Sequence, residues 1–89
     1  MLDEILRRVK GIKKQMEENL PYINDEIQAL IKNKNQTVDR IEEILDILLN
    51  YGQLRVGEAE FKKLNTYYSS FNPTNAKFYT NSYKEMNED

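Results

Sequence analysis

Apolar residues recur at helical spacing through the first 52 residues of this chain. Apart from an interruption at Lys34 and the adjacent pair Leu48 and Leu49, the steps between them are threes and fours, which match the helical period of about 3.6 residues. No alternating apolar pattern of the kind that strands show is present there, so we expect helices and no sheet. The apolar positions are Leu2, Ile5, Val9, Ile12, Met16, Leu20, Ile23, Ile27, Leu30, Val38, Ile41, Leu45, Leu48 and Leu49.

Pro21 stands in the middle of this pattern. Proline lacks a backbone donor and crowds the preceding turn, so it breaks or kinks a helix, but it is well tolerated at a helix's first position. We therefore expect a first helix that ends near Asn19, a second that begins at Pro21, and a tight helical hairpin between them. The alternative is one continuous, kinked helix.

The segment KNKNQT, residues 32–37, has the composition of a loop. Its apolar neighbours argue otherwise, because Ile27 and Leu30 before it align with Val38 and Ile41 after it, as on one uninterrupted helix. The phase thus predicts a single helix from about residue 21 to residue 51. The second half of so long a helix would extend past the first helix and would need another element to cover it.

The C-terminal half offers shorter helices for that purpose. Gly52 and Gly57 bracket a short connection. Asn72 and Pro73 end one helix and begin another, since Asn favours the cap and Pro the first turn. The apolar residues on helical spacing are Phe61, Leu64, Tyr68 and Phe71 before this pair, and Ala76, Tyr79, Tyr83 and Met86 after it. The second of these helices is expected to span residues 73 to about 85.

These elements predict an all-α fold: a long helical hairpin with one or two shorter C-terminal helices, forming a three- to four-helix bundle. Residues 1–86 would form one helical domain, and residues 87–89 a frayed C-terminus. The chain has 89 residues and an apolar content of 39%, so its core is thin. Self-association or partner binding is the expected way to complete such a core.

The composition removes most catalytic chemistry. The chain has no Cys and no His, which excludes disulfides and Cys/His metal sites and removes the commonest bases and nucleophiles. Its glycines are scattered and form no phosphate-binding loop. We expect no enzyme, no catalytic residue, no metal and no cofactor.

Two charged runs have alternative interpretations. An acidic run on one helical face could bind a metal or a basic partner, but a solvated outer face is favoured; it comprises Asp39, Glu42, Glu43 and Asp46. A basic run could contact phosphate or an acidic partner, or equally form an outer face; it comprises Arg7, Arg8, Lys10, Lys13 and Lys14. The net charge of −2 argues against a general affinity for nucleic acid.

The two runs also suggest a homodimer. If two chains pair antiparallel about a point near Glu26, the basic run of one lies beside the acidic run of the other. Spacing alone gives the apolar register of this dimer: Ile5 with Leu48, Val9 with Ile44 or Leu45, and Ile12 with Ile41.

Residues 65–84 are rich in Tyr and Phe and contain no acid. These aromatics could form core, a protein-binding face or a base-stacking surface, and the last fits the acidic chain least. We expect Tyr67, Phe78 and Tyr79 to remain exposed. The candidate partner-binding residues are Tyr67, Tyr68, Phe71, Phe78, Tyr79 and Tyr83.

The sequence therefore favours a small, non-enzymatic protein–protein interaction module that self-associates. Adaptors, inhibitors and immunity or antitoxin proteins share this size and helical character. The alternative is a nucleic-acid-associated regulator that uses the basic run and the Tyr/Lys-rich C-terminal surface. Asp3 and Glu4 are among the first four residues, and no secretory signal or spanning segment is apparent, so a cytoplasmic protein without membrane contact is expected.

Overall fold

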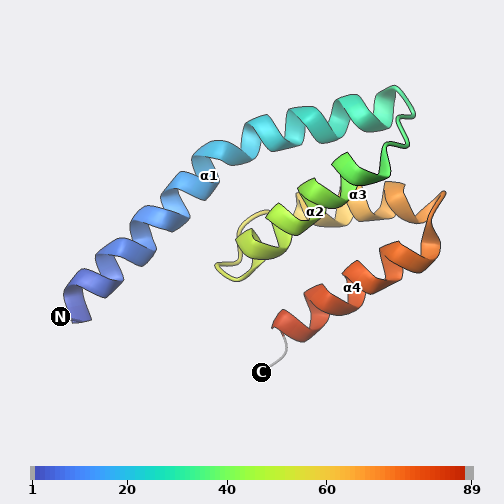
Figure 1. Cartoon of the computed structure of the whole chain (residues 1–89). Coiled ribbons are helices and arrows are strands. Elements are labelled where there is room, and N and C mark those ends of the chain that lie inside the picture. Colours follow the sequence, from blue (N-terminus) through green and yellow to red (C-terminus); the bar gives the residue numbers. More distant parts are fainter. Residues whose placement is uncertain (1, 88–89) are drawn as a thin grey trace.

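Figure 1 shows the computed structural model of the chain, which describes residues 2–87. Within that range there are four α-helices and no strands: α1 (Leu2–Lys32), α2 (Val38–Gly52), α3 (Glu58–Ser69) and α4 (Pro73–Asn87). The all-α prediction is confirmed. The predicted frayed end overlaps α4 at Asn87, and residues 88 and 89 lie outside the described range.

Helix α3 lies at the centre of the bundle and packs against each of the other three helices. Across the described residues, α1 and α4 do not touch one another. All four helices contribute to one core, whose buried members are Ile27, Leu30, Ile41, Ile44, Leu45, Leu48, Phe61, Leu64, Tyr68, Ala76 and Tyr79. As expected, the C-terminal helices cover the apolar face of α2.

Helix α1 continues through Pro21, so the hairpin predicted at this point is wrong and the continuous alternative is correct. Figure 1 shows α1 changing direction in its middle third. The missing hydrogen bond and the crowded ring cost about 3 kcal/mol. Burial of Ile27 and Leu30 further along the helix offsets this cost, because each such side chain contributes about 1.5–3 kcal/mol.

The chain reverses instead at residues 33–37, so the predicted single helix from 21 to 51 is also wrong. Lys34 adopts a left-handed backbone with φ of 52°. The Asn35 amide donates to the Leu30 carbonyl at 2.9 Å, and the Lys34 amide to Ile31 at 3.1 Å. This pair of bonds is a Schellman motif, which satisfies the last carbonyls of a helix.

The connection between α2 and α3 also begins with a Schellman motif. Arg55 is left-handed with φ of 59°, and the Val56 and Arg55 amides donate to the Tyr51 and Gly52 carbonyls. Gly57 follows with φ of 82° and is the N-cap of α3. A Cβ at Gly57 would lie 3.1 Å from Leu48 and 3.2 Å from Leu20, so this glycine allows three helices to meet closely.

The part of α1 that precedes this meeting point extends beyond the bundle. Leu20 is the first apolar residue of α1 that packs against the core. We call residues 2–19 the arm. In Figure 1 the arm diverges from the other helices and ends at the N-terminus, away from them. The structure thus separates a packed bundle from a projecting helical segment.

Candidate functional site

The arm carries an apolar face that is exposed over most of its length, with only Met16 at its inner end half-buried. At about 100° per residue its apolar side chains fall within a sector of about 120°. We call them the arm stripe: Leu2, Ile5, Leu6, Val9, Ile12 and Met16. Leu2 is 71% exposed, Ile5 58%, Leu6 and Ile12 50%, and Val9 41%. Large aliphatic side chains gathered at such exposure are typical of interaction surfaces.

The arm stripe continues in phase into the buried face of the same helix. Leu20, Ile23, Ile27 and Leu30 follow it along α1 in the same angular sector, and Ile27 is 0% exposed. The same side of one helix is therefore core in its C-terminal half and bare in the arm. Leu2 and Leu6 belong to this surface although the proposed dimer register did not include them, and their angular position was the signal that could have identified them.

Cations surround the arm stripe. Residues 5–16 contain five basic side chains and no acidic one. The ion pairs among residues 2–87 are Glu26–Arg40, Arg40–Glu43 and Glu58–Lys62, so none of the arm cations takes part in one. Their charge is available to a ligand or partner.

The predicted self-association residues divide into two groups. Ile5, Val9 and Ile12 are exposed on the arm, but Ile41, Leu45 and Leu48 are each 0% exposed. The second group packs inside its own bundle, where α3 and α4 cover α2. The predicted register, which sets Ile12 of one chain on Ile41 of another, is therefore wrong because Ile41 has no free surface.

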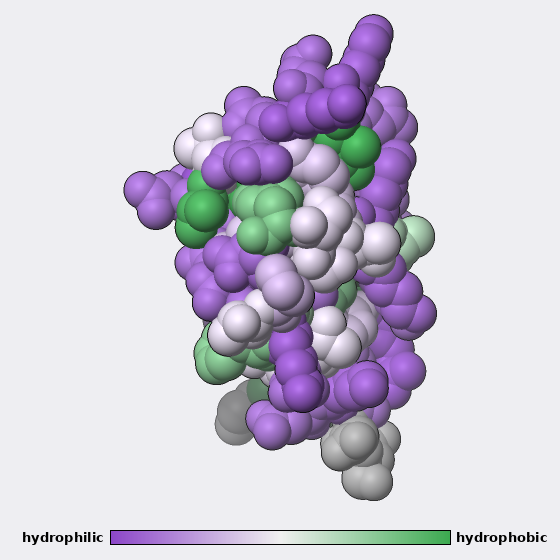
Figure 2. Space-filling model, turned by 90° about the vertical axis from the view of Figure 1, so that its right-hand side faces the viewer, coloured by the Kyte–Doolittle hydropathy of each residue, from purple (hydrophilic) through white to green (hydrophobic). Residues whose placement is uncertain are grey.

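The C-terminal aromatic residues are mostly structural. Tyr68 is 0% and Tyr79 6% exposed, so the expectation that Tyr79 faces solvent is wrong, and neither residue can serve as a contact surface. Tyr67, Phe71 and Tyr83 are partly buried against the core. Phe78 is 66% exposed. Figure 2, which views the end of the bundle opposite the arm, shows hydrophilic surface around a central area of intermediate hydropathy, with a few separate hydrophobic spots.

The acidic run of α2 explains why two tyrosines can be buried. The Tyr68 hydroxyl donates to Glu42 and accepts from Asn72 at 3.0 Å. The Tyr79 hydroxyl donates to Asp46 at 3.0 Å. Burial and the neighbouring carboxylate raise the pKa of both phenols above the ordinary value of 10.0. Glu42 and Asp46 thus anchor α3 and α4 to α2. The sequence pattern, which favoured a solvated outer face for the acidic run, did not predict this role.

Of the other two acids of that run, Glu43 takes part in an ion pair within the described residues and Asp39 does not. Glu43 lies 3.0 Å from Arg40, and Arg40 also holds Glu26 of α1 through two hydrogen bonds. The hydrogen bond from Arg40 lowers the pKa of Glu26. This pair links α1 to α2 close to their connecting turn. Asp39 is exposed, and among residues 2–87 no three Asp, Glu, His or Cys side chains are placed to hold a metal ion.

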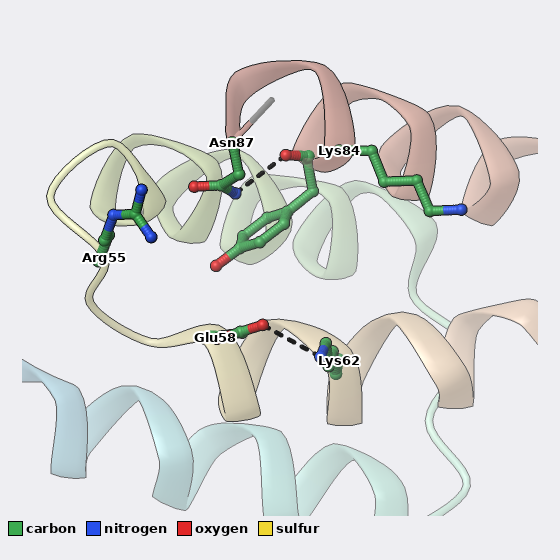
Figure 3. A pocket seen from close by; sticks show the side chains of 6 residues that line it. Arg55, Glu58, Lys62, Lys84 and Asn87 are labelled. Atoms are coloured by element: carbon green, nitrogen blue, oxygen red, sulfur yellow. Dashed lines mark hydrogen bonds and ion pairs between the residues drawn. The ribbon is translucent and has the colours of Figure 1, made fainter. Parts of the chain in front are cut away.

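A surface hollow of about 400 Å³ lies between the 53–57 connection, α3 and α4 (Figure 3). Its only carboxylate, Glu58, lies 3.0 Å from Lys62, and its phenol, Tyr83, stacks on Phe61 with ring centroids 4.4 Å apart. Three cations against one acid give it a positive balance. The lining side chains are Arg55, Glu58, Lys62, Tyr83, Lys84 and Asn87, and they include no paired nucleophile and base.

Comparisons of the chain with protein-family models, with curated proteins and with solved structures found no match. The fold and the surface chemistry therefore carry the functional argument. Of the helices described between residues 2 and 87, none has a stretch apolar and long enough to cross a membrane.

Proposed function

We propose that this protein is a small, non-enzymatic protein–protein interaction module whose binding element is the arm. The observation that carries the proposal is the arm stripe, because five of its six apolar side chains are 41–71% exposed where the same face of α1 is buried further along. Exposed apolar surface of this extent is costly in water and is compensated when another protein covers it. An adaptor or an inhibitor would use such a segment.

The bundle supports this role by supplying a rigid base. Residues 20–32 of α1 are fixed to the core through Leu20, Ile27 and Leu30. The arm therefore projects from a folded domain as part of a helix that has already started. A partner that binds the arm pays less for ordering it than for ordering a free peptide, since the helix is already nucleated.

The nucleic-acid alternative has weaker support. The arm cations could contact phosphates, but Tyr68 and Tyr79 are buried and so are lost as a base-stacking platform. The net charge of −2 also opposes the approach of a polyanion. Titration with mixed DNA and RNA at low and high salt tests this alternative, since phosphate contacts weaken steeply with salt.

A selection of helical peptides from a display library tests the proposed function. The wild-type chain would be used as bait beside Val9→Asp, which places a charge in the arm stripe. Gly11→Asp is the matched control, because it adds the same charge to the same helix on its polar side, where a Cβ meets nothing within 4 Å. We expect binders that the wild type and Gly11→Asp retain and Val9→Asp loses. Peptides that bind the wild type, Val9→Asp and Gly11→Asp equally well would refute the role of the arm.

A further inference from the structure

The shape of the molecule beside the arm limits what can cover the arm stripe. The bundle lies on the same side of α1 as the stripe, because Leu20, Ile27 and Leu30 continue it and pack into the core. Figure 1 shows α2, α3 and α4 all on that side. A flat surface such as a bilayer would meet the bundle before it reached the arm stripe. A single helix, about 10–12 Å across, fits there as α3 fits beside the second half of α1.

The spacing of the arm stripe also indicates a helical occupant. Leu2, Ile5, Val9, Ile12 and Met16 are separated by alternating steps of three and four residues. This is the a/d pattern of a coiled coil, in which each apolar side chain inserts between four residues of the facing helix. The next step, from Met16 to Leu20, is four again and ends the alternation. The seam therefore covers about two heptads, or about 22 Å of helix.

The charges beside the seam indicate the charge that the partner helix should have. In heptad register Arg8 occupies a g position and Lys13 an e position, and these positions flank the seam and face the partner's own e and g residues. Arg7, Lys10 and Lys14 add positive charge on the outer side. A partner with acidic residues beside its seam would form ion pairs along this stretch and would be attracted from a distance.

The arm of a second copy of this chain lacks acidic residues beside its seam. A parallel pairing of two arms brings Arg8 of one beside Lys13 of the other. An antiparallel pairing sets g positions beside g and e beside e, and the arm's e and g residues Leu6, Arg8, Lys13 and Gln15 offer no acid to either cation. Like charges at these positions are destabilising. The acidic face of α2 does not serve either, since its apolar residues Ile41 and Leu45 are fully buried.

We propose that the arm binds an acidic amphipathic helix of another protein. This helix lies along the arm stripe, beside the bundle, and its acidic residues pair with Arg8 and Lys13. This rests on the proposed function and names the chemistry of the partner. The partner helix has an apolar a/d seam of about two to three heptads and Glu or Asp at its e and g positions.

Two synthetic peptides of about three heptads test this partner chemistry. Both have the same Leu/Ile seam, but one has Glu and the other Lys at every e and g position. Fluorescence anisotropy would measure their binding to the full chain, to the double variant Arg8→Glu/Lys13→Glu, to Val9→Asp and to Gly11→Asp. We expect the Glu peptide to bind the wild type at least about tenfold more tightly than the Lys peptide at low salt, with the difference shrinking as salt screens it.

The variants separate failure of this inference from failure of the proposed function. We expect the double variant to prefer the Lys peptide, Val9→Asp to bind neither, and Gly11→Asp to match the wild type. If both peptides bind equally and Val9→Asp loses both, the arm is a docking element but the acidic specificity is overturned. If neither binds, the acidic-helix proposal is overturned. Light scattering and vesicles rich in phosphatidylserine would then show whether a second copy or an anionic bilayer occupies the arm. A second copy keeps the proposed function, whereas a bilayer, or neither occupant, overturns it as well.

Discussion

Two isoleucines on the same face of one helix provide a direct test of the division between arm and bundle. Ile12 in the arm is 50% exposed, and Ile27 beyond Pro21 is 0% exposed. Truncating a buried Ile to Ala costs about 2–5 kcal/mol. At an exposed site the change stays within about 0.5 kcal/mol, and the better helix propensity of Ala recovers a few tenths of that. We therefore expect Ile27→Ala to destabilise the chain by at least about 1.5 kcal/mol more than Ile12→Ala.

Urea unfolding followed by far-UV circular dichroism would measure both free energies. For a domain of this size, about 2 kcal/mol lowers the thermal midpoint by about 8–16 °C, and the total stability is only about 4–13 kcal/mol. Ile27→Ala should thus be near its folding limit, while Ile12→Ala melts with the wild type. A loss above about 1 kcal/mol for Ile12→Ala would refute the reasoning, and growth of that loss with protein concentration would identify a second copy as the cover.

Three further expectations concern the bundle. Gly57→Ala should cost at least about 1–2 kcal/mol because its left-handed backbone disfavours a Cβ, and an unchanged urea midpoint would contradict that geometry. The pKa of Tyr79 is raised by burial and then by its carboxylate partner, so its contribution holds below about pH 10 and is lost as pH rises further; Tyr79→Phe should flatten the decline in stability measured between about pH 9 and 11. The pKa of Glu26 is lowered by its hydrogen bond from Arg40, so that contribution is present above the ordinary pKa of 4.5 and lost as pH falls; Glu26→Gln should therefore unfold less steeply with acid, and an unaltered acid profile would count against the pair.

The sequence predicted the helices and misplaced one of the connections between them, the turn at residues 33–37, which was expected near Pro21. The periodic apolar pattern identified the all-α fold, and the Asn72–Pro73 pair correctly marked the boundary between α3 and α4. Pro21 predicted a helix boundary because proline inside a helix costs free energy, but the burial of Ile27 and Leu30 further along α1 exceeds that cost. Residues 33–37 were read as helix because phase was preserved across them. That agreement was coincidental, and the Asn- and Lys-rich composition was the better signal.

The arm could be identified from the sequence only in part. Its apolar spacing and its basic run are both visible there. Which apolar faces remain exposed depends on how the helices pack. Because the turn was misplaced, the arm was paired with the apolar face of α2, which α3 and α4 in fact bury. The burial of Tyr68 and Tyr79 depends on carboxylates more than 25 residues away in the chain. Such pairings are set by the tertiary arrangement, which a one-dimensional pattern does not contain.

The continuity of α1 across the edge of the bundle has a consequence for its amide protons. In residues 23–31 the helix is held by the core, so hydrogen exchange there requires unfolding of the bundle. In the arm only the helix's own bonds protect the amides, and an unsupported segment of this length, with Gly11 inside it, opens readily. A partner helix would slow exchange in the arm and leave the bundle unchanged. Part of its binding energy would go into that ordering, which favours a complex that forms specifically and dissociates quickly.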